Sequence, residues 1–197
     1  MFGPTIQGEG SSIGTPVLFL RTSGCNRWSG RPEDKEKSIC NFCDTDFFGG
    51  DMLTAEEIAE KLKELSKDVK VVVISGGEPT LQIDENLLSI LSLNGFKLHL
   101  ETNGSRAIGG LTKYFSHISM SPKQSREETH LEYADDIKLL FPFIKDSITY
   151  QAFKFFPHKQ TYIQPLWDSN KKETLEFIFK NPLVKLSPQL HKYLELQ

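Results

Sequence analysis

Three cysteines, Cys25, Cys40 and Cys43, are the only ones in the chain, and they are spaced C-x14-C-x2-C. Three thiolates leave one position of a four-coordinate site open, so the spacing predicts a metal centre at which a small molecule can react. A disulfide framework explains these cysteines poorly, because their number is odd and the chain has neither a secretory signal nor a long apolar run. We therefore expect a reducing, cytoplasmic location.

The cysteines alone leave the metal open between zinc and iron. A structural zinc site needs a fourth protein ligand, and no histidine lies between Cys25 and His99. That ligand would have to be a distant histidine or the carboxylate of Asp44 or Asp46. An iron–sulfur cluster held by three cysteines instead keeps one iron free to bind a small molecule.

Length and composition allow one domain with one core. The chain has 197 residues, of which 38% are hydrophobic and 25% are charged. Its formal net charge of -3 provides no bulk field for nucleic acid, and no segment is long and apolar enough to suggest a membrane partner. We expect a small-molecule partner rather than nucleic acid or membrane.

Short apolar runs alternate with amphipathic stretches along the chain. The apolar runs predict strands, at 17–21, 71–74, 97–100, 118–120, 137–140 and 162–163. Helices are predicted over 54–66, where Thr54 and Glu57 form a capping-box pattern, over 84–93 and over 171–180. This alternation favours an α/β fold with a mostly parallel sheet. A complete eight-stranded barrel takes about 250 residues, so a six-strand partial barrel suits this length better.

Polar residues follow the C-terminal ends of most predicted strands. They are Arg21 and Cys25, 75–79 (SGGEP), 101–104 (ETNG), 121–123 (SPK) and 164–165 (QP). Sites in parallel sheets and barrels are built at this edge. Any one of these residues can be an ordinary turn former. Five groups that each follow the C-terminal end of a strand indicate a site.

Two glycine-containing motifs could bring backbone close to a ligand, because glycine has no Cβ. In 76–79 (GGEP), Glu78 would add a carboxylate suited to a cationic amino group. The motif 7–10 (QGEG) could serve a ligand in the same way, or could be a simple glycine-rich loop.

Together these motifs resemble the 7-carboxy-7-deazaguanine synthase family of radical S-adenosylmethionine (SAM) enzymes. The resemblance runs almost end to end, over 5–10 (TIQGEG), Arg21, 24–26 (GCN), 28–30 (WSG), 40–46 (CNFCDTD), 76–79, 101–104, 121–123, 164–165 and 191–193 (HKY). The commonest cysteine pattern of the superfamily is C-x3-C-x2-C. The longer C-x14-C-x2-C spacing resembles a subset of this synthase family.

The resemblance implies an α/β fold, a partial (βα)6-type radical SAM barrel that is modified and shortened. It implies a single domain over 1–197, with a cluster-binding loop at 22–51 and a substrate-binding tail at 184–197. Family members usually have a strand segment before the TIQGEG motif, and Met1 lies only four residues ahead of it, so a first strand could be missing.

The implied activity is that of a carbon–nitrogen lyase of queuosine-type 7-deazapurine biosynthesis. It would convert 6-carboxy-5,6,7,8-tetrahydropterin to 7-carboxy-7-deazaguanine with loss of ammonia. The implied cofactors are a 4Fe-4S cluster, SAM and Mg²⁺. The implied partners are a flavodoxin that donates electrons and a second copy of the chain in a homodimer.

The resemblance also assigns site residues. The implied catalytic residues are the three cluster ligands Cys25, Cys40 and Cys43, together with Glu9 and Arg21. The implied SAM-binding residues are Gly76, Gly77, Glu78, Glu101, Ser121, Lys123 and Gln164. The implied pterin-binding residues are Gln7, Glu9, Arg21, Ser75, His191 and the C-terminal carboxylate of Gln197. Thr45 is the implied magnesium ligand, since Mg²⁺ prefers oxygen. Arg21 suits a carboxylate because its guanidinium pairs bidentately.

Two other classes of protein remain as alternatives. A different radical SAM enzyme, such as a glycyl-radical activase, would share the cluster but would have no use for Gln7, Glu9 and His191 in this arrangement. A non-catalytic zinc module would be colourless and would not cleave SAM.

Overall fold

The structure is a computed structural model that describes residues 1–196. Its contacts divide the chain into two compact units. Unit 1 comprises Met1–Thr5, Pro16–Thr102 and Ile108–His117, and unit 2 comprises Ile6–Thr15, Asn103–Ala107 and Ile118–Gln197. Gln197 itself, the predicted pterin ligand, lies outside the described residues.

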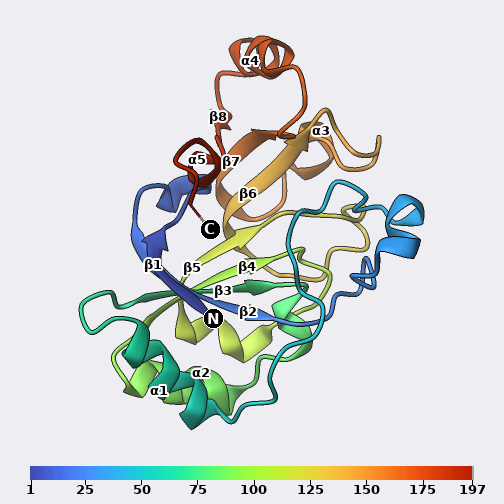
Figure 1. The fold of residues 1–197 in the computed structure, drawn as a ribbon. Coiled ribbons are helices and arrows are strands. Elements are labelled where there is room, and N and C mark those ends of the chain that lie inside the picture. The colour runs from blue at the N-terminus through green and yellow to red at the C-terminus, as the bar shows by residue number, and fades with distance from the viewer. Residues whose placement is uncertain (197) are drawn as a thin grey trace. The chain divides into compact units, whose positions relative to one another are not determined.

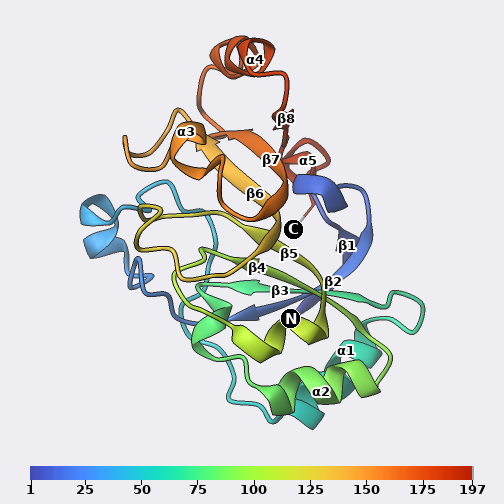
Figure 2. The same ribbon diagram turned by 180° about the vertical axis from the view of Figure 1, so that it is seen from behind.

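Unit 1 contains a parallel sheet made by strands β2 (Pro16–Thr22), β3 (Val71–Gly76) and β4 (Lys97–Thr102). Strand β1 (Phe2–Ile6) begins the chain. Helices α1 (Ala55–Leu65) and α2 (Glu85–Leu93) pack on each other and cover one face of these strands (Figure 1 and Figure 2). Leu18, Ile74 and Leu100 on the three strands are fully buried and form the centre of this core.

The helices of unit 1 begin where side chains cap them. The Thr54 hydroxyl accepts the Glu57 N–H at 3.2 Å, and the Glu57 carboxylate accepts the Thr54 N–H at 2.7 Å, which confirms the predicted capping box. The Asp84 carboxylate accepts the Leu87 N–H at 2.8 Å at the start of α2.

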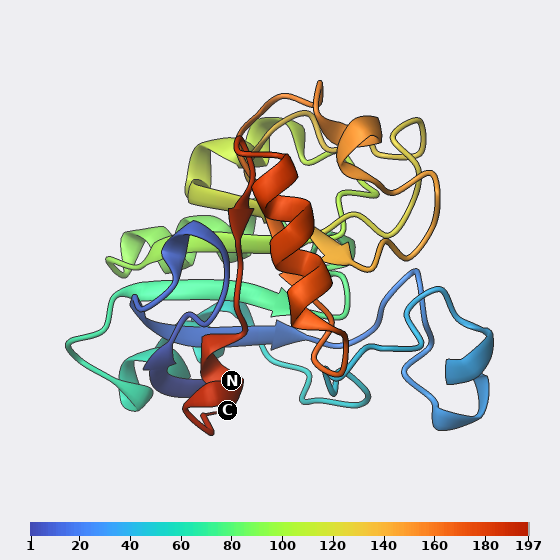
Figure 3. The same ribbon diagram turned by 90° about the horizontal axis from the view of Figure 1, so that it is seen from above.

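Unit 2 holds the other parallel strands. These are β5 (Phe115–Met120, whose first residues belong to unit 1), β6 (Ala134–Phe141), β7 (His158–Pro165) and β8 (Lys185–Leu186). Helix α4 (Lys171–Lys180) packs against β7 and β8 (Figure 3), and α3 (Tyr150–Phe153) and α5 (Leu190–Tyr193) are single turns. Four 3-10 helices, at Gly10–Ser12, Pro32–Lys37, Pro79–Leu81 and Gly109–Tyr114, complete the elements.

The prediction of an α/β fold with parallel strands is confirmed. All six predicted strands correspond to β2–β7, and all three predicted helices to α1, α2 and α4. Two strands were not predicted. Strand β1 contains Gly3 and Pro4, which weaken a strand pattern, and β8 has only 2 residues. Within residues 1–196, no helix is long and apolar enough to cross a membrane.

Candidate functional site

In unit 1, the loop after β2 is fastened to the end of β3 by backbone hydrogen bonds. Gly77 N–H donates to the Thr22 carbonyl at 3.1 Å, and Glu78 N–H donates to the Gly24 carbonyl at 2.9 Å. Gly24 N–H in turn donates to the Phe47 carbonyl at 3.2 Å, which closes the cysteine-bearing loop at its base. Cys25 therefore lies beside the GGEP motif, at the carboxyl end of parallel strands.

Gly76 and Gly77 are needed for this contact. A Cβ at Gly76, whose φ is +124°, would lie 2.1 Å from the Thr22 carbonyl oxygen. A Cβ at Gly77 would lie 1.9 Å from the Gly24 carbonyl oxygen and 3.1 Å from Cys25 Cβ. These glycines thus allow a close approach to Thr22 and to the cysteine loop, and the expected approach to a ligand stays a prediction.

The Glu78 carboxylate is fully buried and is held by the protein itself. Its Oε1 accepts hydrogen bonds from the Thr80 N–H at 3.1 Å, from the Thr80 hydroxyl at 2.6 Å and from the Thr102 hydroxyl at 2.6 Å. These bonds join the turn after β3 to the end of β4. Glu101, another predicted SAM residue, is half-buried at that same end.

The three cysteines lie in one loop and form no disulfide. Cys40 is buried, Cys25 and Cys43 are half-buried, and Cys43 N–H donates to the Cys40 carbonyl at 2.9 Å. Among residues 1–196, no three side chains of His, Cys, Asp or Glu gather closely enough to bind a metal ion. The donor set of three thiols on one loop, none of them in a disulfide, fits a cluster with an open iron.

Arg21 lies at the end of β2, in register with Ser75 on β3. Its guanidinium lies over the stacked rings of Phe2 and Phe19, 4.8 and 5.9 Å from their centroids. Partial desolvation lowers the pKa of Arg21, and the negative charges of Asp44, Asp46 and Cys43 oppose that change. Arg21 is therefore close to the segment that includes half-buried Thr45, the predicted magnesium ligand.

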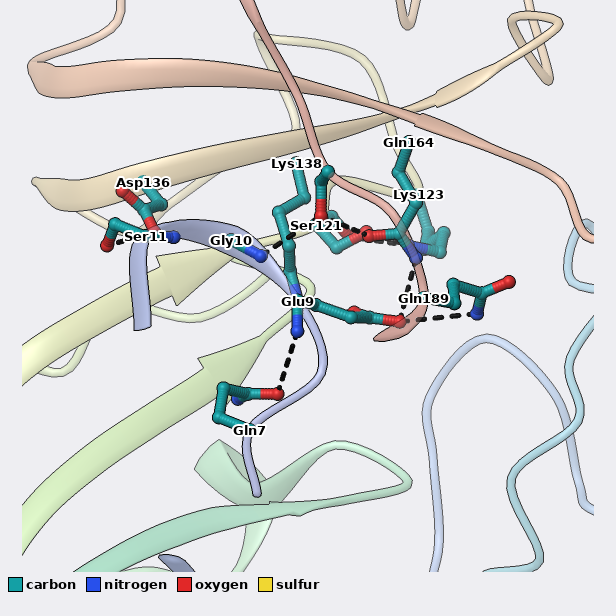
Figure 4. Close-up of polar contacts among 11 residues, drawn as sticks. Gln7, Glu9, Gly10, Ser11, Ser121, Lys123, Asp136, Lys138, Gln164 and Gln189 are labelled. Carbon is teal, nitrogen blue, oxygen red and sulfur yellow. Dashed lines mark hydrogen bonds and ion pairs between the residues drawn. The ribbon is translucent and has the colours of Figure 1, made fainter. Parts of the chain in front are cut away.

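In unit 2, the QGEG motif places the Glu9 carboxylate among polar side chains (Figure 4). Glu9 Oε2 lies 2.7 Å from Lys138 Nζ, and Oε1 accepts hydrogen bonds from Gln164 Nε2 at 2.9 Å and from Gln189 Nε2 at 3.2 Å. Burial raises the pKa of Glu9, but Lys138, His191 and Gln189 together outweigh it and bring the pKa down to about 2. Glu9 is therefore a carboxylate at neutral pH.

The C-terminal helix α5 packs directly on the QGEG motif. Leu190 N–H donates to the Gly8 carbonyl at 2.9 Å, and a Cβ at Gly8 would lie 2.2 Å from His191 Nδ1. Buried Gln7 accepts the Glu9 N–H at 3.2 Å through its side-chain oxygen. The structure thus brings together Gln7, Glu9 and His191, which were predicted to bind one substrate.

Ser121 and Lys123 follow β5 and contact each other. Lys123 Nζ donates to the Ser121 carbonyl at 2.8 Å and to the Ser121 hydroxyl at 2.6 Å (Figure 4). Gln164, predicted to bind SAM, donates a hydrogen bond to Glu9, which was predicted to bind the pterin. Within unit 2, residues assigned to both small molecules therefore share one polar cluster.

Comparisons with known proteins give the family. Residues 34–140 match the radical SAM superfamily. The chain is 35% identical over 206 residues to the 7-carboxy-7-deazaguanine synthase of Caulobacter vibrioides, a match that covers 98% of this chain and 95% of the relative. The chain belongs to the 7-carboxy-7-deazaguanine synthase family.

Another member of the synthase family, from Burkholderia multivorans, is 33% identical over 205 residues, with 98% of this chain and 95% of the relative covered. The crystal structure of QueE from Escherichia coli matches with a TM-score of 0.67 at 21% identity, over 95% of this chain and 91% of that one. The predicted radical SAM fold is confirmed. Membership of the superfamily implies a 4Fe-4S cluster and SAM as cofactors.

Four side chains that contact residues 9–11 in unit 2 were not predicted from the sequence: Asp136, Lys138, Ser187 and Gln189. One signal was available, because Lys138 is a charged residue inside the apolar run at 137–140. Lysine is almost never fully buried without a partner, so a lysine in a buried strand predicts a nearby carboxylate.

Proposed function

We propose that the chain is a 7-carboxy-7-deazaguanine synthase. It would convert 6-carboxy-5,6,7,8-tetrahydropterin to 7-carboxy-7-deazaguanine with loss of ammonia. The observation that carries this proposal is the relationship to these synthases over 98% of the chain. The grouping of Gln7, Glu9 and His191 supports it, because a glycyl-radical activase has no use for that arrangement.

Cys25, Cys40 and Cys43 would hold the cluster, which when bound supplies the electron for reductive cleavage of SAM. The radical SAM superfamily uses a reductant, and we propose a flavodoxin as the electron donor here. The residues proposed to contact SAM are Gly76, Gly77, Glu78, Glu101, Ser121, Lys123 and Gln164. Within the protein, the two glycines also make room for the cysteine loop, and Glu78 also joins the turn after β3 to β4.

The pterin would be held by charge and hydrogen bonding. Arg21 carries a planar guanidinium that pairs bidentately with a carboxylate such as that of the substrate. Glu9 would accept hydrogen bonds from ring N–H groups, because its low pKa keeps it an acceptor at neutral pH. Gln7, Ser75, His191 and the carboxylate of Gln197 complete the proposed substrate contacts.

Three further features belong to the proposal. Thr45 would contribute a hydroxyl to Mg²⁺, beside Asp44 and Asp46 in a segment rich in oxygen donors. The enzyme would work in the cytoplasm, where its three thiols stay reduced. It would also form a homodimer.

The test is anaerobic reconstitution with iron and sulfide, followed by incubation with SAM, a chemical reductant, Mg²⁺ and the pterin. We expect the deazapurine product by mass spectrometry, formed together with 5′-deoxyadenosine. Cys40→Ala, purified in parallel, should yield neither product, because the cluster loses one of its three protein ligands.

Each alternative gives a different result in this assay. Formation of 5′-deoxyadenosine without any deazapurine would indicate a different radical SAM enzyme. A colourless protein that retains zinc and never cleaves SAM would indicate the zinc module.

A further inference from the structure

Strand β6 presents two buried charged side chains that none of the predicted roles uses. Asp136 is 2% exposed and Lys138 is 5% exposed. Since side chains two positions apart on a strand lie on the same face, both reach the same side of β6. Both contact the segment 9–11, which includes the QGEG carboxylate (Figure 4).

Lys138 forms an ion pair with Glu9. The two charged atoms lie 2.7 Å apart, and the side chains are only 5% and 18% exposed. The second Glu9 oxygen is held by Gln164 from β7 and by Gln189, which precedes α5. Side chains from three other segments of the chain therefore determine the direction in which the Glu9 carboxylate points.

The residues after Glu9 are fixed as firmly. Asp136 Oδ2 accepts the Ser11 N–H at 2.9 Å and the Ser11 hydroxyl at 2.7 Å. The buried Ser187 hydroxyl accepts the Gly10 N–H at 3.0 Å and donates to Gln164 Oε1 at 3.1 Å. The backbone of residues 10–11 is thus bonded to β6 and to the segment after β8, and the Glu9 side chain to β6, β7 and Gln189.

A buried ion pair is a poor source of stability, because desolvation of two charges cancels most of their attraction. Apolar side chains of similar volume would fill the same space at least as well. A charged pair at this position therefore points to a requirement for the charge and orientation of Glu9, rather than for packing. Glu9 is the partner with a proposed contact outside the protein.

We propose that Lys138 is a positioning residue of the synthase reaction, which orients the Glu9 carboxylate toward the N–H groups of the pterin, with Asp136 holding the adjoining Ser11. This inference rests on the proposed function. Lys138 does not touch the substrate in this account. It acts through Glu9, so its removal should affect the pterin and leave SAM alone.

The test uses the reconstituted holoenzyme and Lys138→Met, which keeps the length of the side chain and removes its charge. We expect KM for the pterin to rise about ten- to a hundredfold, the usual range for loss of one charge-assisted hydrogen bond. KM for SAM should stay at the wild-type value. A purely structural role would instead lower thermal stability and change both KM values together, or neither.

Lys159→Met is the matched control. Lys159 makes an ion pair of the same length, 2.7 Å to Asp135, but its side chain is 72% exposed and it lies outside the proposed machinery. The Asp135 side chain is 14% exposed, but the pair is open to solvent at Lys159 and contributes little, so both KM values should match those of the wild type.

Lys138→Met alone leaves the buried Glu9 charge without its cation and could therefore misfold. A double variant tests the inference without that unpaired charge. Glu9→Gln with Lys138→Met removes both charges and should fold. Its pterin KM should equal that of Glu9→Gln alone, because both substitutions remove the same interaction.

Two results would overturn the inference while the wild type is active: a wild-type pterin KM in folded Lys138→Met, or a fully additive effect in the double variant. Failure of the proposed function is distinguishable from either. In that case the wild type itself makes no deazapurine, and the inference falls with it.

Discussion

Glu9 keeps its negative charge in a largely buried place because Lys138 lies 2.7 Å away. Burial pushes the pKa of Glu9 upward, and the charge and hydrogen bonds of its neighbours bring it down, from an ordinary 4.5 to about 2. Lys138 on β6 and His191 on α5 are the cations that face it, and Asp136 is the nearby anion on β6. At this scale, the site depends on a balance between desolvation and pairing.

This balance predicts how stability changes with pH. A carboxyl whose pKa is lowered by folding stabilises the protein above the unfolded pKa, and that contribution is lost as pH falls through the folded pKa. The free energy of unfolding of the wild type should therefore decline more steeply between pH 4.5 and about 2 than that of Glu9→Gln. Urea unfolding of the apoprotein at a series of pH values measures both curves.

Glu60→Gln is the control for this prediction, because Glu60 pairs with Lys63 on the surface with 67% of its side chain exposed. Its curve should follow that of the wild type. Parallel curves for wild type and Glu9→Gln would show that folding leaves the pKa of Glu9 at its ordinary value.

Thr45 allows a second prediction at the residue scale. If its hydroxyl binds Mg²⁺, Thr45→Ala should lower turnover and raise the Mg²⁺ concentration needed for half-maximal rate, since a site with few protein ligands depends on each one. Iron content and SAM binding should stay unchanged. Thr45→Ser, which keeps the hydroxyl, should recover the wild-type Mg²⁺ dependence, and an identical dependence in Thr45→Ala would remove the residue from the metal site.

At the scale of elements, the cysteine loop depends on the end of β3. Gly77 lets the Gly24 carbonyl approach where any side chain would collide with it, and the next residue, Glu78, donates its N–H to that carbonyl. The loop is thus positioned in part by a strand that lies about fifty residues further along the chain. The GGEP motif, which was predicted to bind a ligand, therefore also supports the loop that carries the cysteines.

Gly77→Ala should therefore displace the loop around Cys25. Overpacking of this kind costs about 1–3 kcal/mol, and the loop can move more easily than the sheet. We expect lower iron and sulfide content per chain after reconstitution, with a modest loss of stability in urea. Gly110→Ala is the matched control, because a Cβ at Gly110 meets no atom within 4 Å, and it should retain the full cluster. Wild-type iron content in Gly77→Ala would contradict this account.

Much of the element pattern could be predicted from sequence. Alternating apolar runs gave β2–β7, and the Thr54 and Glu57 pair gave the start of α1, because these signals are local. The polar cluster around Glu9 could be predicted only in part. Lys138 and Gln189 lie 129 and 180 residues from Glu9 in the sequence, and no local pattern reports contacts at such separations.

At the scale of the molecule, the two ends of the chain meet in unit 2. Leu190 and His191 pack on Gly8, so the QGEG motif and α5 form one surface. Segments from both ends of the sequence are therefore needed to build the side of the site proposed for the pterin. Unit 1, by contrast, carries all three cysteines between Pro16 and Thr102.

Gly8→Ala should move helix α5 away from the QGEG motif. Its Cβ would lie 2.2 Å from His191 Nδ1 and 2.9 Å from the His191 backbone nitrogen, so rotation of the imidazole alone cannot relieve the clash. We expect faster hydrogen exchange at residues 190–196 and a higher KM for the pterin, with iron content unchanged. Gly110→Ala again serves as control, and unchanged exchange in α5 would show that the motif and the helix are not coupled.

The same long-range contacts determine when this region can form during synthesis. Residues 9–11 leave the ribosome early, whereas Asp136, Lys138, Gln164, Ser187 and Gln189 follow 125 to 180 residues later. At about 5–20 residues per second, the Glu9 motif waits roughly 9–36 seconds for its last partner. A nascent chain that stops before residue 134 can still pair β2, β3 and β4, but it lacks Lys138, Gln164 and Gln189, the side chains that hold the Glu9 carboxylate. Such unfinished chains contain all three cysteines but lack the contacts that we propose orient the substrate.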